Sequence, residues 1–447
     1  MKQLFGTDGI RAVAGEYPLD APTVRVFGRA LARVLGERTS RPPRVVIGRD
    51  TRASGSWLSD AVAHGLAAGG AASTEAGVLP TPGLAFATRS GGFDAGVMIS
   101  ASHNPFEDNG LKVFGADGMK IPDTVEARIE ALILAPDDAP PGAGGPGAQA
   151  DGELAQLYIR ELESFVAARR LEGMKLVLDG ANGAAAALAP RIFRDLGASV
   201  TSIGDAPDGR NINLGCGSLH LEALAARVIA EGADMGLAFD GDADRCLAVD
   251  RRGRVIDGDH ILYLVGRRLD REGRLRGRAI VATIMSNYWL EKHLADLGVR
   301  LVRAPVGDKY VLEEMIAGDL VLGGEQSGHV IFRERSTTGD GILTGLLLLD
   351  TLRAEAEPLE SILDGIVPFP QMLLNVRVKE KPDLRADAAI GPVVAEAERE
   401  LSGRGRVVLR YSGTEPVARV MVEADDDVLV RGVAERVASA IRARLGS

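Results

Sequence analysis

The chain has little cysteine, no long apolar segment and no excess of basic residues, and each shortage excludes a class of protein. Cys216 and Cys246 are the two cysteines among 447 residues. They provide neither a disulfide framework nor a metal-site spacing, which favours a reducing compartment. No apolar run is long enough to span a bilayer, and the opening MKQLFGTDGIRA lacks the apolar core of a secretory signal. The net charge of −10 disfavours a nucleic-acid-binding protein. We therefore expect a cytoplasmic protein that binds neither nucleic acid nor membrane.

A repeated pattern of buried strand, helix, strand, helix and strand organises most of the chain. Its first strands begin at Arg44, Lys175 and Arg278. Each round predicts one α/β domain, because continuous apolar strands separated by helices are typical of parallel sheets with both faces covered. The fold class predicted is α/β, with three similar α/β domains that contain mixed, parallel-rich sheets and a smaller C-terminal α+β domain.

Changes in composition indicate where these domains meet. Residues 135–152 are rich in proline, glycine and alanine, which predicts a linker, and two prolines interrupt residues 367–371. Beyond them the strands alternate, and a final amphipathic helix is expected. We predict domains over residues 1–152, 153–252, 253–367 and 368–447. The final helix should bury one face that is made of Val430, Val433, Val437, Ile441 and Leu445.

The third strand of the first round ends in the sequence SASHNP, residues 100–105. A buried strand that delivers Ser102 and His103 to its end places a nucleophile where α/β sheets keep their sites. An ordinary serine- and asparagine-rich turn is the alternative. The nucleophile elbow of hydrolases is excluded, because no glycine lies two places to either side of Ser102. Lys112 adds a positive charge just beyond the loop.

The third strand of the second round leads into Asp240, Asp242 and Asp244. Carboxylates this close together repel one another unless a cation neutralises them, and their hard oxygens suit magnesium or calcium. A solvated acidic turn is the alternative, but the loop directly follows an apolar strand. A calcium loop of the EF-hand type is excluded, because Arg245 and Arg251 stand where it requires glycine and glutamate. The pattern therefore favours magnesium, with Arg245 available to a phosphate.

Two further loops suit a sugar and a phosphate. The third round ends in GEQSGH, where Glu325 and Ser327 could bind vicinal hydroxyls and His329 could serve as an acid, a base or a phosphate contact. In the last domain, RYSGTEP and the arginine that follows it could form an anion cradle. A hairpin turn with exposed arginines is the alternative there. The cradle residues are Arg410, Ser412, Gly413, Thr414 and Arg419.

Together, SASHNP, DGDADR, GEQSGH and RYSGTEP resemble the motifs of the α-D-phosphohexomutases, in family order and over essentially the whole chain. The resemblance implies a phosphoserine enzyme of four domains around a central cleft. Ser102 would carry the phosphoryl group, and one Mg²⁺ per active site would be held by Ser102 and the three aspartates. Glu325 and Ser327 would bind the sugar, and the cradle would bind the distal phosphate. The reacting centre would be lined by Arg11, His103, Lys112, Arg245 and His329, with Lys112 and His329 as the leading acid/base candidates.

Within that family, FGTDGIRA, PDGRNIN and the glutamine of GEQSGH are similar to the branch that acts on hexosamine phosphates. The resemblance implies interconversion of glucosamine 6-phosphate and glucosamine 1-phosphate, with a bisphosphorylated sugar as intermediate and activator, on the route to UDP-N-acetylglucosamine. A mannose or glucose phosphomutase and a non-catalytic sugar-phosphate sensor are the alternatives. One departure is Lys309, where the family pattern has arginine. A small-molecule sugar phosphate is the expected partner, and the protein is expected to be a monomer or a homodimer.

Overall fold

The structure of the protein is a computed structural model that describes residues 4–6, 8–135, 148–166, 171–412 and 415–446. The chain forms two compact units: the first contains residues 1–283 and 304–356, and the second contains residues 284–303 and 357–447. Among the described residues, no helix combines the length and the apolar character that a membrane crossing requires.

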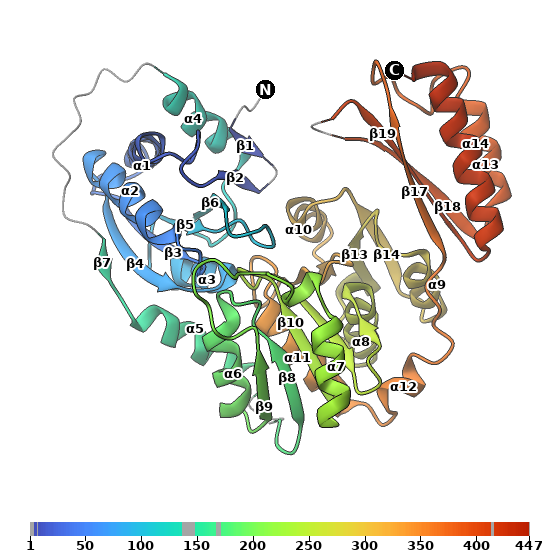
Figure 1. Cartoon of the computed structure of the whole chain (residues 1–447), viewed down its shortest axis with the longest axis horizontal. Helices are drawn as coiled ribbons and strands as arrows, with labels where there is room; N and C mark the ends of the chain where they lie inside the picture. Colours follow the sequence, from blue (N-terminus) through green and yellow to red (C-terminus); the bar gives the residue numbers. More distant parts are fainter. Residues whose placement is uncertain (1–3, 7, 136–147, 167–170, 413–414, 447) are drawn as a thin grey trace. The chain divides into compact units, whose positions relative to one another are not determined.

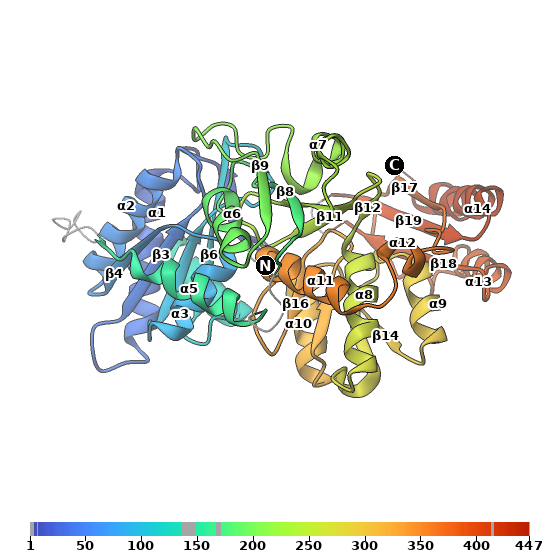
Figure 2. The same ribbon diagram turned by 90° about the horizontal axis from the view of Figure 1, so that it is seen from below.

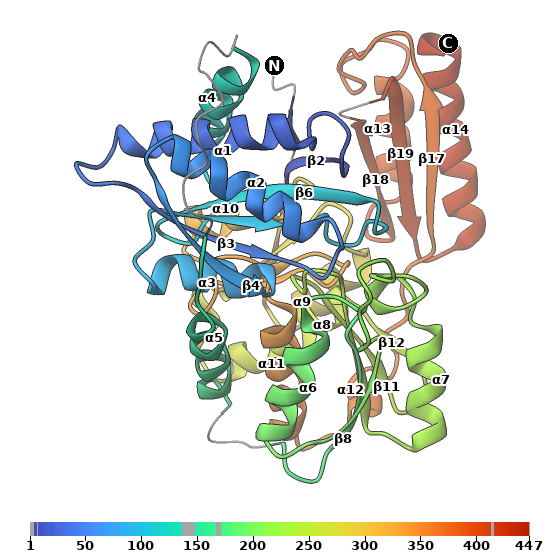
Figure 3. The same ribbon diagram turned by 60° about the vertical axis from the view of Figure 1, so that its left-hand side comes forward.

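The first unit begins with a seven-stranded sheet of order β1-β2-β6-β5-β3-β4-β7. Its strands and helices are Phe5–Gly6 (β1), Gly9–Val13 (β2), Ala21–Gly36 (α1), Arg44–Arg49 (β3), Gly55–Ala68 (α2), Ala72–Val78 (β4), Thr81–Ser90 (α3), Ala95–Ile99 (β5), Asp108–Gly115 (β6), Asp123–Leu134 (α4) and Gln149–Ala150 (β7). Strand β3 pairs in parallel with β4 and β5, and β6 returns antiparallel to β5. All of β5 is buried, because α2 and α3 pack against the central strands (Figure 3).

The second sheet has the order β12-β11-β10-β8-β9. Its elements are Glu153–Ser164 (α5), Lys175–Asp179 (β8), Ala185–Asp195 (α6), Ser199–Ile203 (β9), the 3₁₀ helix Gly217–Leu219 (η1), Glu222–Glu231 (α7), Met235–Phe239 (β10), Cys246–Asp250 (β11) and Val255–Ile256 (β12). Strand β8 is parallel to both of its neighbours, and β11 returns antiparallel to β10. Every residue of β10 and β11 is buried, so this hairpin is held rigidly.

A third sheet in the same unit contains β13, β15 and β16. The elements of this region are Gly258–Arg271 (α8), the 3₁₀ helix Arg276–Arg278 (η2), Ala279–Thr283 (β13), Asp308–Ala317 (α10), Leu322–Gly324 (β15), Val330–Phe332 (β16) and Gly341–Ala354 (α11). Strand β15 is parallel to β13 and antiparallel to β16. Helices α8 and α11 lie side by side (Figure 2). Each of them starts at an aspartate, Asp257 or Asp340, whose side chain accepts a hydrogen bond from a backbone N–H of the first turn.

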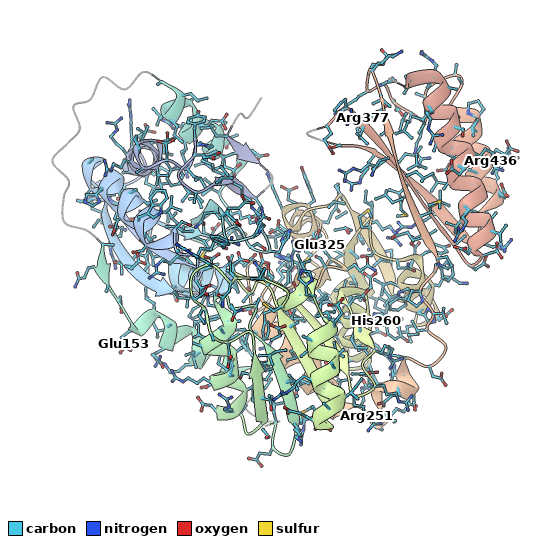
Figure 4. All side chains as sticks on the ribbon, in the orientation of Figure 1. Glu153, Arg251, His260, Glu325, Arg377 and Arg436 are labelled. Atoms are coloured by element: carbon cyan, nitrogen blue, oxygen red, sulfur yellow. The ribbon has the colours of Figure 1, made fainter. Side chains whose placement is uncertain are left out.

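The second unit contains an antiparallel sheet of order β17-β19-β18. The elements of this unit are Tyr288–Asp296 (α9), Arg300–Ala304 (β14), Leu359–Ile362 (α12), Gln371–Arg377 (β17), Gly391–Glu400 (α13), Gly405–Tyr411 (β18), Val417–Ala424 (β19) and Asp427–Leu445 (α14). The last residue of β14, Ala304, is counted with the first unit. Helices α13 and α14 cover one face of this sheet (Figure 1). The predicted apolar face of α14 is confirmed from Val430 to Leu445. On its exposed face, Arg436 pairs with Glu400 of α13 (Figure 4).

The α/β sheets share one local plan, in which the third strand of each round ends in a loop and an antiparallel strand returns. The mixed, parallel-rich fold is confirmed, but the returning strands β6, β11 and β16 were not predicted. Each of them begins beside polar residues, and the apolar residues of β6 are also interrupted by Lys112. Strand β15 was expected to end at Leu322 and instead runs to Gly324. An added Cβ at position 323 would lie 2.7 Å from the sulfur of Met315 on α10, so glycine lets this helix pack closely against β15.

Candidate active site

Three aspartates in the β10–β11 loop lie together at the edge of the second sheet. Asp240 and Asp242 are fully buried and Asp244 nearly so. One carboxylate oxygen from each lies within 4.8 Å of the others. Ala243 adopts a left-handed backbone with φ of 57°, which turns the chain within the group. Burial, and then the charges of Asp244 and Asp242, raise the pKa of Asp240 well above its ordinary value. Burial would also raise the pKa of Asp244, but the charges of Lys112 and His329 outweigh it and lower that pKa below its ordinary value. The three carboxylates therefore share one buried site in which their charges interact strongly.

This aspartate cluster fits a hard divalent cation. Among the described residues, Asp242 Oδ1 and Asp244 Oδ1 are buried and have no hydrogen-bond partner. Buried carboxylate oxygens normally have a partner, and a cation that prefers oxygen ligands would provide one. The alternative of a solvated acidic turn is excluded, because such a turn would expose its carboxylates and these are buried.

Ser102 contacts the aspartate cluster from the β5–β6 loop. Its Oγ donates a hydrogen bond to Asp240 Oδ2 at 2.6 Å and lies 3.2 Å from Nδ1 of His103. The backbone of Ser102 has a φ of 53°, a left-handed value that is unfavourable for a residue with a side chain. Its N–H donates to Ser100 Oγ at 2.9 Å. The structure thus brings the predicted nucleophile and the predicted metal ligands together across 138 residues of sequence.

Lys112 lies on the buried strand β6, behind the same carboxylates. Its Nζ is 2.8 Å from Asp242, 3.0 Å from Asp8 and 3.7 Å from Asp244. Burial alone would lower the pKa of Lys112, but these carboxylates outweigh it and raise the pKa above the ordinary value. Lys112 is therefore a fixed positive charge next to the aspartates.

This ionic network is extended by Asp8, Lys120 and Asp308, which no sequence pattern indicated. Lys120 Nζ lies 2.5 Å from Asp8 and 2.6 Å from Asp308. Asp308 begins α10, and its carboxylate lies 3.7 Å from Nε2 of His329. Lys309, the next residue, stands where the family pattern has arginine. It pairs at 2.7 Å with the exposed Asp123 and does not line the cavity described below.

The two histidines of the site have opposite electrostatic surroundings. Burial, and then the charges of Arg245 and Arg11, lower the pKa of His103 to about 4. Burial would also lower the pKa of His329, but Asp244 and Asp308 outweigh it and raise the pKa to about 9. The Nε2 atom of His329 lies 3.0 Å from the backbone nitrogen of Gly339, within hydrogen-bonding distance.

A cavity of ≈ 430 Å³ opens among these loops, all within the first unit. Glu325, labelled in Figure 4, enters it from the β15–β16 loop, accepts a hydrogen bond from Gly307 N at 3.1 Å and contacts Ser327 Oγ at 3.3 Å. Lys112 and Ser327 are not among the residues that line it. Predicted site residues that line the cavity are Arg11, Ser102, His103, Asp244, Arg245, Glu325 and His329.

The predicted anion cradle lies in the second unit. Arg410 of β18 and Arg419 of β19 are directly opposite in the antiparallel register. Arg419 Nη2 lies 3.5 Å from Glu415, and Ser412 Oγ accepts a hydrogen bond from Glu415 N at 3.2 Å. Gly413 and Thr414, also predicted for this cradle, lie outside the described residues. Two facing arginines repel one another, so an anion between them would be stabilising.

These features are typical of proteins that bind phosphate esters. They are a buried hydroxyl against a carboxylate cluster, a cavity lined by arginine and histidine as well as by carboxylates, and a separate arginine pair. The sequence matches all four domains of the phosphoglucomutase/phosphomannomutase family. Its alpha/beta/alpha domains I, II and III match residues 2–139, 156–253 and 257–369, and its C-terminal domain matches residues 373–440. The chain belongs to this family.

Curated relatives extend over the whole chain. The phosphoglucosamine mutase of Solibacter usitatus (strain Ellin6076) is 48% identical over 445 residues, which cover 100% of this chain and 99% of the relative. The phosphoglucosamine mutase of Brevibacillus brevis (strain 47 / JCM 6285 / NBRC 100599) is 45% identical over 451 residues and 100% of both chains. Among solved structures, a phosphoglucomutase/phosphomannomutase family protein from Burkholderia thailandensis has a TM-score of 0.81 and 27% identity, with both chains fully covered.

Proposed function

We propose that the protein interconverts glucosamine 6-phosphate and glucosamine 1-phosphate, the step that supplies the 1-phosphate for UDP-N-acetylglucosamine. It is an isomerase that works by phosphoryl transfer, as its relatives' shared name indicates. We assign Ser102 as the reacting group because its Oγ lies 2.6 Å from the buried Asp240, beside a cavity whose lining includes arginine and histidine. A hydroxyl in that position can accept and return a phosphoryl group.

The reaction requires two transfers. In the first, the bond between phosphorus and Ser102 Oγ breaks, a bond to the free sugar hydroxyl forms, and the proton of that hydroxyl passes to a base. The sugar is then a bisphosphate. In the second, its other phosphoryl group passes to Ser102 Oγ, and the sugar oxygen that it leaves takes up a proton. The transition state of each transfer spreads negative charge over the phosphoryl oxygens.

Residues of the first unit would stabilise that charge and move the protons. Arg11 and Arg245 line the cavity, and Lys112 is held as a cation beside it. His329 is the proposed acid/base group, and His103 lies within reach of Ser102 Oγ. Lys112 was the other acid/base candidate, but the carboxylates around it hold it as a cation, so we propose that it supplies positive charge rather than moving protons. Asp240, Asp242, Asp244 and Ser102 would hold one Mg²⁺, which when bound neutralises charge on the transferring phosphoryl group.

Two further groups would recognise the ligand. Glu325 and Ser327 would bind sugar hydroxyls, and Arg410, Ser412 and Arg419, with Gly413 and Thr414, would bind the phosphate that is not reacting. The cytoplasmic location and the monomeric or homodimeric state remain predictions from the sequence.

A coupled assay tests the proposed substrate. Purified protein with magnesium and a trace of bisphosphate should convert glucosamine 6-phosphate faster than glucose or mannose 6-phosphate. Faster turnover of a neutral sugar would instead support a phosphomannomutase or phosphoglucomutase. Binding of all three sugars without turnover would support a sensor.

A further inference from the structure

Arg52, in the loop after β3, is almost completely buried, with 1% of its surface exposed. Its guanidinium donates hydrogen bonds to backbone carbonyl oxygens of the loop that contains Ser102. Nη2 donates to Ser102 O at 2.9 Å and to Asn104 O at 2.8 Å. Nη1 donates to Asp108 O at 2.9 Å and to Pro105 O. One side chain therefore fixes the loop from the residue that would carry the phosphoryl group to the start of β6.

Asp50 fixes the orientation of that guanidinium. It accepts from Arg52 Nε at 2.9 Å, and also accepts from Ser100 Oγ at 2.6 Å. Ser100 Oγ in turn accepts from the N–H of Ser102. Both backbone groups of Ser102 are thus linked, directly or through one serine, to the Asp50–Arg52 pair.

Asn213, between β9 and η1, holds the same loop from a separate part of the first unit. Its Nδ2 donates to Ser102 O at 3.0 Å and to Asn104 O at 3.1 Å. The backbone of Asn213 is itself held, because its N–H donates to Ala181 O at 2.9 Å. Ser102 O therefore accepts from both Arg52 and Asn213, while Ser102 Oγ points to Asp240.

We infer that Arg52 and Asn213 are positioning residues for phosphoryl transfer, an inference that rests on the proposed role of Ser102. Two physical reasons support it. The left-handed backbone of Ser102 is unfavourable and persists only where surrounding contacts hold it. In addition, carbonyl oxygens near a phosphate would repel it, and these two donors bind the carbonyl oxygens of Ser102 and Asn104.

Neither residue is a catalytic residue in this arrangement. Both are absent from the lining of the described cavity, and Arg52 has its positive charge balanced by Asp50. Their effect should therefore appear in the rate of transfer rather than in the binding of the sugar phosphate.

Arg52→Lys tests the inference, because lysine keeps the charge but replaces the planar fork with a single nitrogen that cannot reach the same set of carbonyls. We expect kcat to fall by about 10- to 100-fold, as a misplaced reacting group does, while KM for glucosamine 6-phosphate stays within about 3-fold. Amide hydrogen exchange should accelerate in peptides that cover residues 100–108.

Arg268→Lys is the matched control. Arg268 of α8 is also a buried arginine, and it donates to Asp350 of α11 at 2.7 Å. Its other hydrogen bonds go to Glu272 and Thr351, which lie outside the Ser102 loop. The control should lose stability to a similar extent but keep kcat and the exchange of residues 100–108. Asn213→Ala should lower kcat less than Arg52→Lys, and the double variant should lose less than the product of the two, because both donors bind Ser102 O.

The outcomes separate this inference from the proposed function. Full activity in Ser102→Ala would overturn both. If Ser102→Ala is inactive while Arg52→Lys and Asn213→Ala keep wild-type kcat, the proposed function stands and the positioning role is wrong. If Arg52→Lys does not fold, Asn213→Ala decides by the same readouts: an unchanged kcat, or a loss that appears only in KM, would contradict the inference.

Discussion

The two units each gather side chains of one charge, but they do so in different surroundings. In the first unit, Asp240, Asp242 and Asp244 are buried at the tip of a hairpin whose strands are fully enclosed. In the second, Arg410 and Arg419 face one another on neighbouring strands, and the side chain of Arg419 is 30% exposed. Burial, and then the charge of Arg419, lower the pKa of Arg410.

The difference in burial teaches what each group can hold. Charges in a buried cluster are screened weakly, so the aspartates should retain a tightly bound cation. Charges at a partly exposed pair are screened by water and salt, so the arginines suit an anion that must bind and leave in every turnover. The proposed reaction would need both, because one metal site would serve both transfers while the sugar changes orientation between them.

The largest expected effect is in the buried cluster. Asp242→Asn should lower turnover by about 10²- to 10³-fold, because it removes a charge that no water can replace. MgCl₂ should raise the melting temperature of the wild-type protein, and Asp242→Asn should abolish that rise. Chelation with EDTA should inactivate the wild-type enzyme, and added magnesium should restore it.

Asp250→Asn is the control for that variant, because Asp250 is buried at the opposite end of the same hairpin and binds backbone N–H groups instead. It should keep the magnesium response. Wild-type turnover by Asp242→Asn in EDTA would show that the cluster is not a metal site.

A smaller effect is expected in the arginine pair. Arg419→Ala should cost about 1.5–3 kcal/mol of binding and raise KM for the 1- and 6-phosphates alike, since the same pair serves both orientations of the sugar. More bisphosphate should also escape before its second transfer. Arg431→Ala on α14, which breaks an exposed pair with Asp427, should change neither KM. An increase confined to one direction's substrate would contradict a shared phosphate site.

The smallest effect should follow from Glu415→Gln. Glu415 is 60% exposed and lies 3.5 Å from Arg419, where it competes with an anion. Its removal should lower KM by about 2-fold at low ionic strength, and the gain should disappear in high salt. Asp427→Asn, the matched change at the Arg431 pair, should leave KM constant. A higher KM in Glu415→Gln would mean that the carboxylate itself contacts the ligand.

Residues that are close in sequence were the ones that sequence patterns could identify. Asp240, Asp242 and Asp244 form one local motif directly after an apolar strand, and Ser102 occupies the corresponding place in the first round. The apolar face of α14 could also be predicted, because helical periodicity is a pattern among residues that are close in sequence.

Residues that only tertiary pairing brings together were missed. Asp8, Lys120 and Asp308 form one ionic network from three distant segments, and nothing near any of them in the sequence indicates it. Arg52 reads as an ordinary loop arginine, because the carbonyls that it binds lie 50 to 56 residues away. Strand β6 escaped prediction because its hydrophobic residues are interrupted by Lys112, whose burial depends on Asp242 from another sheet.

Intact-mass analysis of the purified protein, combined with turnover, tests the central claim most directly. The wild-type protein should gain the mass of one phosphate on incubation with the bisphosphorylated sugar, and Ser102→Ala should show neither that gain nor measurable conversion of glucosamine 6-phosphate. Full conversion by Ser102→Ala, or a phosphate that remains on that variant, would contradict a phosphoserine mechanism at this residue.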